Sequence, residues 1–173
     1  DADLRKSVLK GRYKTNASRY GLSHYLSGQA SIADVTCKTN IENFYVIFSG
    51  PVPPNPSELL GNDAFRLLLE YLRNEYDYVI VDTPPLGSVI DGAVAAQYCD
   101  GTVVVIESGA ISYKFAQKVK EQLEKVDCRI LGVILNKVNM SGKGYYGAYY
   151  GKYYGKYYGK YYGGNEEGGL HSA

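Results

Sequence analysis

Two kinds of apolar pattern alternate along residues 1–140. Four short runs are almost continuously apolar and rich in β-branched side chains, as strands covered on both faces are. They span residues 45–48, 78–81, 102–106 and 130–135. Between them, apolar residues recur at helical spacing after Ser57, a typical N-cap residue, and again over residues 113–126. Because strands and helices alternate, we expect an α/β fold with a parallel sheet and helices on both faces.

Ligands of such sheets bind beyond the carboxyl ends of the strands. The residues that follow Val81, Ile106 and Leu135 are therefore expected on the active edge of the sheet.

Residues 141–173 have a different composition, almost entirely Gly, Tyr, Lys and small polar residues. Tyrosine pairs recur every four residues, and the glycine in each repeat would cost a helix about 1 kcal/mol relative to alanine. The repeats over residues 145–162 contain no aliphatic residue larger than alanine around which a core could form. We therefore expect a globular domain over residues 1–140 and a disordered, accessible tail over residues 141–173.

Bulk composition excludes several classes of protein. The net charge of +1 gives no general attraction to nucleic acid or membranes. The three cysteines form no CxxC pair, and neither histidine lies near a cysteine at metal-ligand spacing, so neither a zinc site nor a disulfide framework is expected. No run approaches the roughly 18 to 20 apolar residues that span a bilayer.

Three short segments carry candidate chemistry. Asp1-Ala2-Asp3-Leu4-Arg5 places two acids and an arginine together, although a solvated turn has the same composition. Asp82 follows an apolar run and precedes Thr-Pro-Pro, the Walker B arrangement, in which the carboxylate holds Mg²⁺ directly or through water. The alternative is an aspartate that caps the next helix. Asn136 and Lys137 follow the last predicted strand, where an asparagine either hydrogen-bonds a base or simply forms a turn.

Residues 50–60 contain four prolines and lead into the first predicted helix. Proline fixes the backbone, so this loop is expected to be rigid. It serves either to connect a strand to a helix or to pack against a neighbouring subunit.

Taken in order, these segments resemble the bacterial tyrosine kinases of capsule and exopolysaccharide synthesis, which have a P-loop NTPase-like fold. Asp1–Arg5 resembles the second Walker A-like motif of that family, and residues 50–60 resemble its proline-rich loop. Residues 78–85 resemble Walker B, and residues 132–137 resemble its last strand and base-contacting loop. The tyrosine cluster resembles the family's autophosphorylated tail, which makes residues 1–140 the partial kinase domain.

The resemblance implies a role for each of these residues. Asp1 would accept or orient the proton of the attacking tyrosine hydroxyl, and Asp3 and Asp82 would help to hold Mg²⁺. Arg5 would support phosphate or the local acids, and Asn136, with Lys137, would contact the adenine of ATP. The substrate tyrosines would be Tyr145, Tyr146, Tyr149, Tyr150, Tyr153, Tyr154, Tyr157, Tyr158, Tyr161 and Tyr162.

It also implies partners. We expect a ring-shaped homo-oligomer, a membrane-embedded chain-length regulator that activates the kinase, either fused upstream or separate, and a cognate tyrosine phosphatase. The protein would be cytoplasmic, held at the inner face of the plasma membrane through its activator. No nucleic acid is expected.

No GxxxxGK[ST] run occurs in the sequence. We therefore expect the Walker A loop to lie upstream of Asp1, and the chain by itself to bind ATP poorly and to lack sheet partners. Two alternatives stay open: a partitioning- or division-type ATPase that phosphorylates no protein, and an inactive module that self-associates through its tail.

Overall fold

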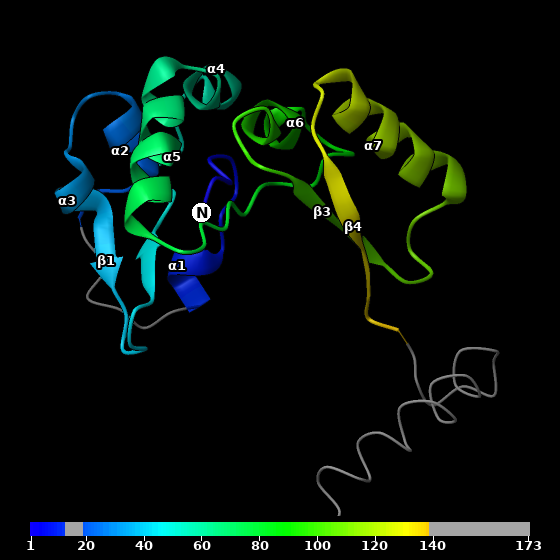
Figure 1. Cartoon of the computed structure of the whole chain (residues 1–173), viewed down its shortest axis with the longest axis horizontal. Helices are drawn as coiled ribbons and strands as arrows, with labels where there is room; N and C mark the ends of the chain where they lie inside the picture. Colours follow the sequence, from blue (N-terminus) through cyan, green and yellow to red (C-terminus); the bar gives the residue numbers. More distant parts are fainter. Residues whose placement is uncertain (13–18, 139–173) are drawn as a thin grey trace, which may run out of the picture. The chain divides into compact units, whose positions relative to one another are not determined.

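The computed structural model describes residues 1–12 and 19–138 (Figure 1). In chain order, the elements are α1 (Leu9–Arg12), α2 (Leu22–Leu26), α3 (Ile32–Val35), β1 (Thr36–Lys38), β2 (Tyr45–Ile47), α4 (Pro56–Leu60), α5 (Asp63–Glu75), α6 (Asp91–Ala96), β3 (Thr102–Glu107), α7 (Tyr113–Lys125) and β4 (Ile130–Asn136). None of the described helices is both long and apolar enough to cross a bilayer. The predicted tyrosine tail lies outside the described residues, so its disorder and the predicted boundary at residue 140 stay predictions.

The chain divides into two compact units. Among the described residues, the first comprises residues 1–12, 19–104 and 112–133, and the second comprises Val105–Ile111 and residues 134–138. All helices belong to the first unit, as far as the chain is described. The first unit therefore holds most of the described core.

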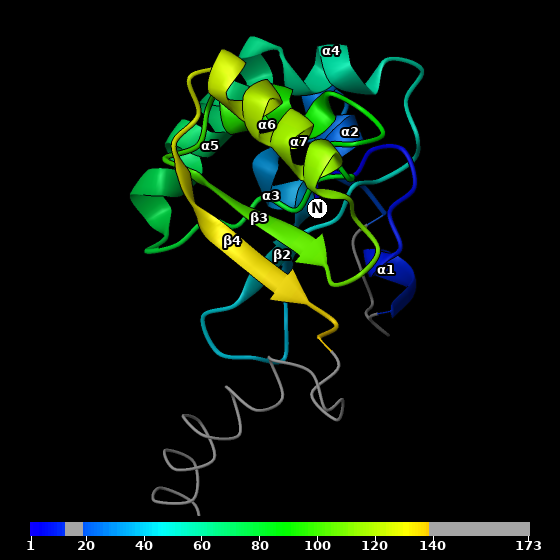
Figure 2. The same ribbon diagram turned by 90° about the vertical axis from the view of Figure 1, so that its right-hand side faces the viewer.

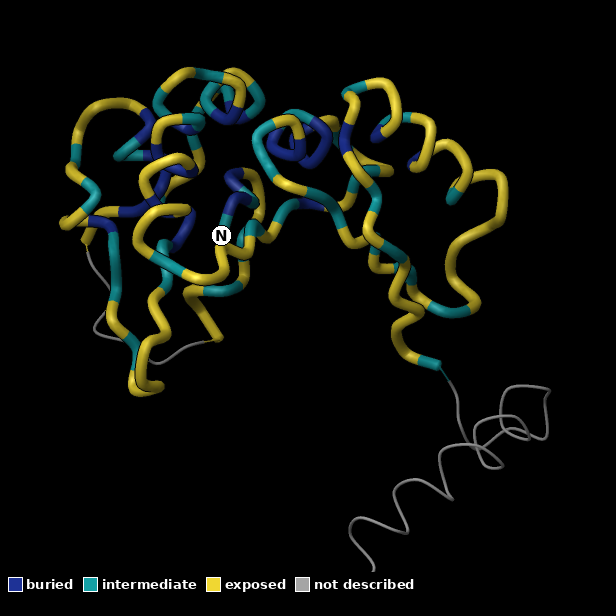
Figure 3. Tube along the Cα trace, viewed as in Figure 1, coloured by how far each residue is buried: buried dark blue, intermediate teal, exposed yellow. Residues whose placement is uncertain are grey.

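The main core forms around α5. Asn62 caps this helix by accepting a hydrogen bond from the amide of Phe65 at 3.0 Å. Phe65, Leu68, Leu69 and Leu72 recur at i, i+3, i+4 and i+7 and are buried. They pack with buried residues of the N-terminal segment, α2 and α4, namely Ala2, Leu4, Leu22, Leu26 and Leu60. Figure 3 shows these buried stretches in dark blue.

The helix predicted after Ser57 is two helices. Pro56 occupies the first turn of α4, where its fixed φ favours the helix, so Ser57 lies inside α4 and is not its N-cap. The chain turns at Gly61 and Asn62 before α5 begins. This correction matters for the site, because the side chain of Ser57 becomes available for another contact.

The predicted strand over residues 45–48 is confirmed as β2, which pairs antiparallel with β1 through the partners Thr36 and Ile47, Cys37 and Val46, and Lys38 and Tyr45. The strand predicted over residues 78–81 is wrong for the described part of the chain. Tyr78 and Ile80 are 88% and 86% exposed, and no described segment pairs with this run along its length. An apolar run becomes a strand only when a neighbour satisfies its backbone groups.

Strands β3 and β4 form a two-stranded sheet and point the same way, joined through α7 (Figure 2). This is the parallel β–α–β arrangement that the sequence predicted. Leu123 of α7 packs with Ala96, Cys128 and the partly buried Val104 and Ile130. The residues of β3 alternate between partly buried and exposed, so within the described residues this strand is covered on one face, where the sequence predicted two. The continuous apolar run could not distinguish these cases.

Helix α2 begins against the end of β2 at a very short backbone distance. The amide of Leu22 donates to the carbonyl of Phe48 (2.7 Å), and that of Ser23 donates to Ser49 (2.9 Å). A Cβ atom on Gly21 would lie 2.4 Å from the nitrogen of Gly50 and 2.6 Å from the carbonyl oxygen of Phe48. Only glycine permits this approach.

We expect Gly21→Ala to lower the free energy of unfolding by about 1–3 kcal/mol, because the added methyl group forces the backbone segments apart. Urea unfolding followed by circular dichroism would measure the change. The matched control is Gly11→Ala, whose Cβ would meet no atom within 4 Å. Equal midpoints for the two variants would contradict the packing argument.

Candidate active site

The first seven residues form a turn that is anchored in the main core by its apolar side chains. Ala2 and Leu4 are each only 1% exposed and lie in the main core, so Asp1 and Asp3, which alternate with them, are only partly buried. Asp1 Oδ2 accepts hydrogen bonds from Ser7 Oγ (2.5 Å) and from the amide of Ser49 (3.2 Å). Asp1 Oδ1 is buried and has no hydrogen-bond partner in the described part of the chain. One oxygen of this carboxylate is therefore anchored and the other is left without a bond.

Asp3 closes the same turn. Its Oδ1 accepts hydrogen bonds from the amides of Arg5 (3.1 Å) and Lys6 (3.0 Å). A short acidic side chain that binds the backbone two and three residues ahead stabilises a turn. The orientation of Asp3 is thus coupled to the backbone of Arg5.

Asp82 lies beside this turn. The amide of Ala2 donates a hydrogen bond to the backbone carbonyl oxygen of Asp82 at 2.7 Å. Asp82 itself is an exposed residue. The structure therefore brings together the two acidic motifs that the sequence singled out separately.

The donor atoms suit Mg²⁺ held largely through water. Mg²⁺ prefers oxygen ligands and usually keeps several of its waters, and the carboxylates of Asp3 and Asp82 offer oxygen alone. The described residues contain no group of three acidic, histidine or cysteine side chains close enough to hold a metal ion directly. The described carboxylates therefore do not form a cage of protein ligands, and Asp3 and Asp82 would hold the ion through its water shell.

Arg5 binds a buried aspartate that the sequence did not single out. Its Nε and Nη2 donate to Asp91 Oδ2 (2.7 Å) and Oδ1 (3.0 Å), and Ser57 Oγ donates to Asp91 Oδ1 (2.6 Å). Asp91 is 0% exposed and begins α6. The hydrogen bond from Arg5, with a smaller contribution from Ser57, lowers the pKa of Asp91 although burial opposes this, and the same pair raises the pKa of Arg5. A signal was present in the sequence, since Asp91 is a lone acid between Ile90 and Gly-Ala.

Asn136 and Lys137 belong to the second unit. The Asn136 carbonyl accepts from the amide of Ser108 (2.9 Å), and its Oδ1 accepts from the amide of Lys137 (2.9 Å). Lys137 has a φ of 54° and its Nζ pairs with Glu107 at 2.8 Å. Both residues are exposed. Their contact with adenine stays a prediction.

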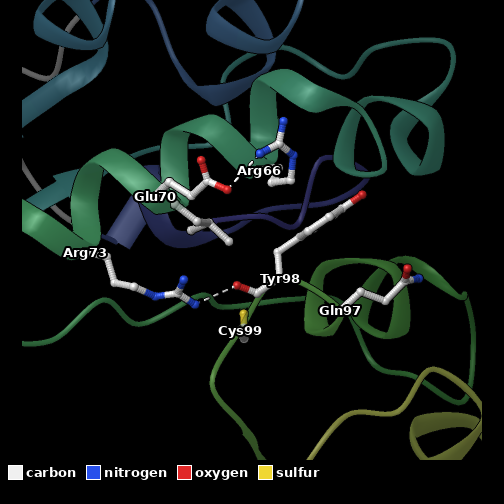
Figure 4. A pocket seen from close by; sticks show the side chains of 7 residues that line it. Arg66, Glu70, Arg73, Gln97, Tyr98 and Cys99 are labelled. Carbon is white, nitrogen blue, oxygen red and sulfur yellow. Dashed lines mark hydrogen bonds and ion pairs between the residues drawn. The ribbon is translucent and has the colours of Figure 1, made fainter.

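A hollow of about 240 Å³ lies between α5 and the residues after α6 (Figure 4). Arg66 pairs with Glu70 at 2.7 Å, and Arg73 donates to the carbonyl of Tyr98 at 3.0 Å and pairs with Asp100. None of the predicted site residues that the structure describes lines this hollow. Both guanidinium groups among its described lining residues already have partners, so neither offers a free positive charge to an anion.

Comparison with known proteins identifies the family to which the chain belongs. The AAA-domain family matches residues 3–136. The tyrosine-protein kinase CpsD of Streptococcus agalactiae is 47% identical over 141 residues, which cover 82% of this chain and 62% of the relative. The kinase domain of the Escherichia coli tyrosine kinase ETK superposes with a TM-score of 0.78 at 38% identity, covering 84% of this chain and 57% of that one. The VpsO kinase domain superposes with a TM-score of 0.74 at 33% identity, covering 80% and 68%.

The chain spans about three fifths of the length of the CpsD relatives it matches. The structural matches confirm the predicted α/β fold with a parallel sheet, of the kind found in P-loop kinase domains. The relatives are named tyrosine-protein kinases, in agreement with the motifs that the sequence singled out. The chain belongs to the AAA-domain family and, within it, to the bacterial tyrosine kinases.

Proposed function

We propose that this chain acts in a protein-tyrosine kinase that transfers the γ-phosphate of ATP to tyrosines of its own C-terminal cluster, Tyr145 to Tyr162. The observation that carries the proposal is the junction of the two acidic motifs, through the 2.7 Å hydrogen bond between Ala2 and Asp82. A tyrosine-rich segment in the same chain supplies acceptors.

Asp1 would act as the proton acceptor. A tyrosine hydroxyl has a pKa of about 10 and is a poor nucleophile at neutral pH. As its oxygen bonds to the γ-phosphorus and the bond to the β–γ bridging oxygen breaks, ADP leaves and the phenolic proton passes to Asp1. Ser7 and Ser49 hold Oδ2 of Asp1, while Oδ1 has no partner among the described residues, so a hydrogen donor at Oδ1 would satisfy a buried acceptor.

Asp3 and Asp82 would hold Mg²⁺ through its water shell. Bound there, the ion would neutralise charge on the phosphates of ATP. Arg5 would stabilise the acidic turn, since its guanidinium group binds Asp91. Asn136 and Lys137 would contact the adenine, as the resemblance to the family implies.

The regulatory partners follow from the same family. We expect the active form to be a homo-oligomeric ring in which each tail reaches a neighbouring site. A membrane-embedded chain-length regulator, fused or separate, would activate the kinase at the inner face of the plasma membrane, and a tyrosine phosphatase would reverse its action. The process served would be capsule or exopolysaccharide synthesis.

The test is an intact-mass measurement after incubation with Mg-ATP. It uses the protein expressed from the full reading frame, with the activator present. We expect a mass gain of several phosphoryl groups, mapped to the tail. The matched control replaces the ten tail tyrosines with phenylalanine, which should remove the gain and leave the catalytic residues intact. ATP turnover without any mass gain would favour the partitioning-type ATPase, and no turnover would favour the self-association module.

A further inference from the structure

An ionic cluster around the buried Asp91 ties the acidic turn to two helices, and the proposed function assigns no role to Ser57 or Asp91. Its members are Arg5 of the turn, Ser57 of α4 and Asp91 of α6. The guanidinium group of Arg5 meets both oxygens of Asp91, and Arg5 Nη2 and Ser57 Oγ also lie 3.0 Å apart. Each of the three residues is therefore hydrogen-bonded to the other two.

The cluster is asymmetric in its exposure. The side chain of Asp91 is 0% exposed, while that of Arg5 is 40% exposed. A fully buried carboxylate is costly unless it is paired and hydrogen-bonded, so the structure commits the guanidinium group to Asp91. A bidentate contact also fixes the direction of the Arg5 side chain, because both hydrogen bonds must form in one plane.

Arg5 in turn fixes the carboxylate of Asp3. The amide of Arg5 is one of the two donors to Asp3 Oδ1, so a shift of the Arg5 backbone displaces Asp3. Asp91 also follows Asp82 along the chain, and the intervening residues connect Walker B to α6. Asp91 is therefore joined to one acidic motif through Arg5 and to the other through the chain.

We propose that Asp91 is a positioning residue for phosphoryl transfer, which holds the turn of Asp1 and Asp3 in register with Asp82 by binding Arg5 together with Ser57. This inference rests on the proposed kinase function. Asp91 itself touches no reacting group. It acts through Arg5, and the effect of its removal should appear at the acidic site.

Asp91→Asn tests the proposal, because asparagine keeps the shape of the side chain and loses its charge. We expect the turnover number for tail phosphorylation to fall about 10-fold or more, since small misplacement of catalytic groups is costly. The magnesium concentration for half-maximal activity should rise, while the KM for ATP should change little. Asp100→Asn, which breaks the separate ion pair with Arg73, is the matched control and should leave both quantities unchanged.

A double-mutant cycle separates positioning from other roles. Arg5→Lys keeps the positive charge but loses the bidentate contact with Asp91. If Arg5 acts through Asp91, the double variant will be about as slow as the slower single variant, because both changes break one link. If Arg5 instead binds phosphate directly, the two effects will multiply, and that result would overturn the proposal. Ser57→Ala, which removes only the hydroxyl group, should give a smaller change in the same direction.

Folding is measured on every variant by urea unfolding. An Asp91→Asn variant that is fully folded and has normal kinetics would also overturn the proposal. If the unsubstituted protein transfers no phosphate to tyrosine, the kinase function fails, which is a different outcome from normal transfer by Asp91→Asn.

Discussion

Replacing Asp1 with asparagine is expected to lower the rate of tyrosine phosphorylation by about 10²- to 10⁴-fold, the usual contribution of a positioned general base. The amide has nearly the same shape as the carboxylate, and its oxygen can still accept the bonds from Ser7 and Ser49. It cannot accept a proton from the tyrosine hydroxyl at neutral pH. The initial rate of phosphotyrosine formation at saturating ATP would measure the loss.

Ser7→Ala is the matched variant for this test. It removes one of the two bonds that anchor Asp1 Oδ2 and leaves the carboxylate in place. Its rate should fall less than that of Asp1→Asn. If Asp1→Asn transferred phosphate as fast as the unsubstituted protein, Asp1 would not be the proton acceptor, and another base would have to be sought.

Local patterns determined most of what the sequence predicted correctly. The helix over residues 113–126 appears as α7 because Ser112 caps it and Val119 and Leu123 face one side. The two strands on either side of this helix also follow from their own apolar runs. In each case the information lies within a few residues, where hydrophobic periodicity and capping act directly.

The misjudged features depend on contacts between distant segments. Residues 78–81 carry a strand pattern, but pairing is a property of two segments and cannot be read from one. Asp91 was missed for the same reason, because its importance arises from Arg5 and Ser57, which are far away in the sequence. The adjacency of Asp82 and the N-terminal turn was expected from the family resemblance, and spacing alone did not require it.

Replacing Asp82 with asparagine is expected to raise the magnesium concentration for half-maximal phosphorylation by about 10- to 100-fold, the usual cost of losing an outer-shell metal partner. The substitution should not disturb the fold. The residue is exposed, and the bond that joins it to Ala2 comes from its backbone carbonyl, which asparagine retains. A magnesium titration of the rate, together with urea unfolding of the same protein, would separate metal binding from stability.

The comparison with Asp3→Ala sharpens this test. Asp3 also accepts two backbone bonds, which alanine cannot accept, so its replacement should alter both the magnesium requirement and the stability of the turn. Asp82→Asn should alter the magnesium requirement alone. An unchanged requirement in Asp82→Asn, with transfer at the normal rate, would contradict the role of Asp82 as a Walker B acid. A raised requirement with normal unfolding would place the ion beside the junction of the two acidic motifs, where the transferred phosphate must also lie.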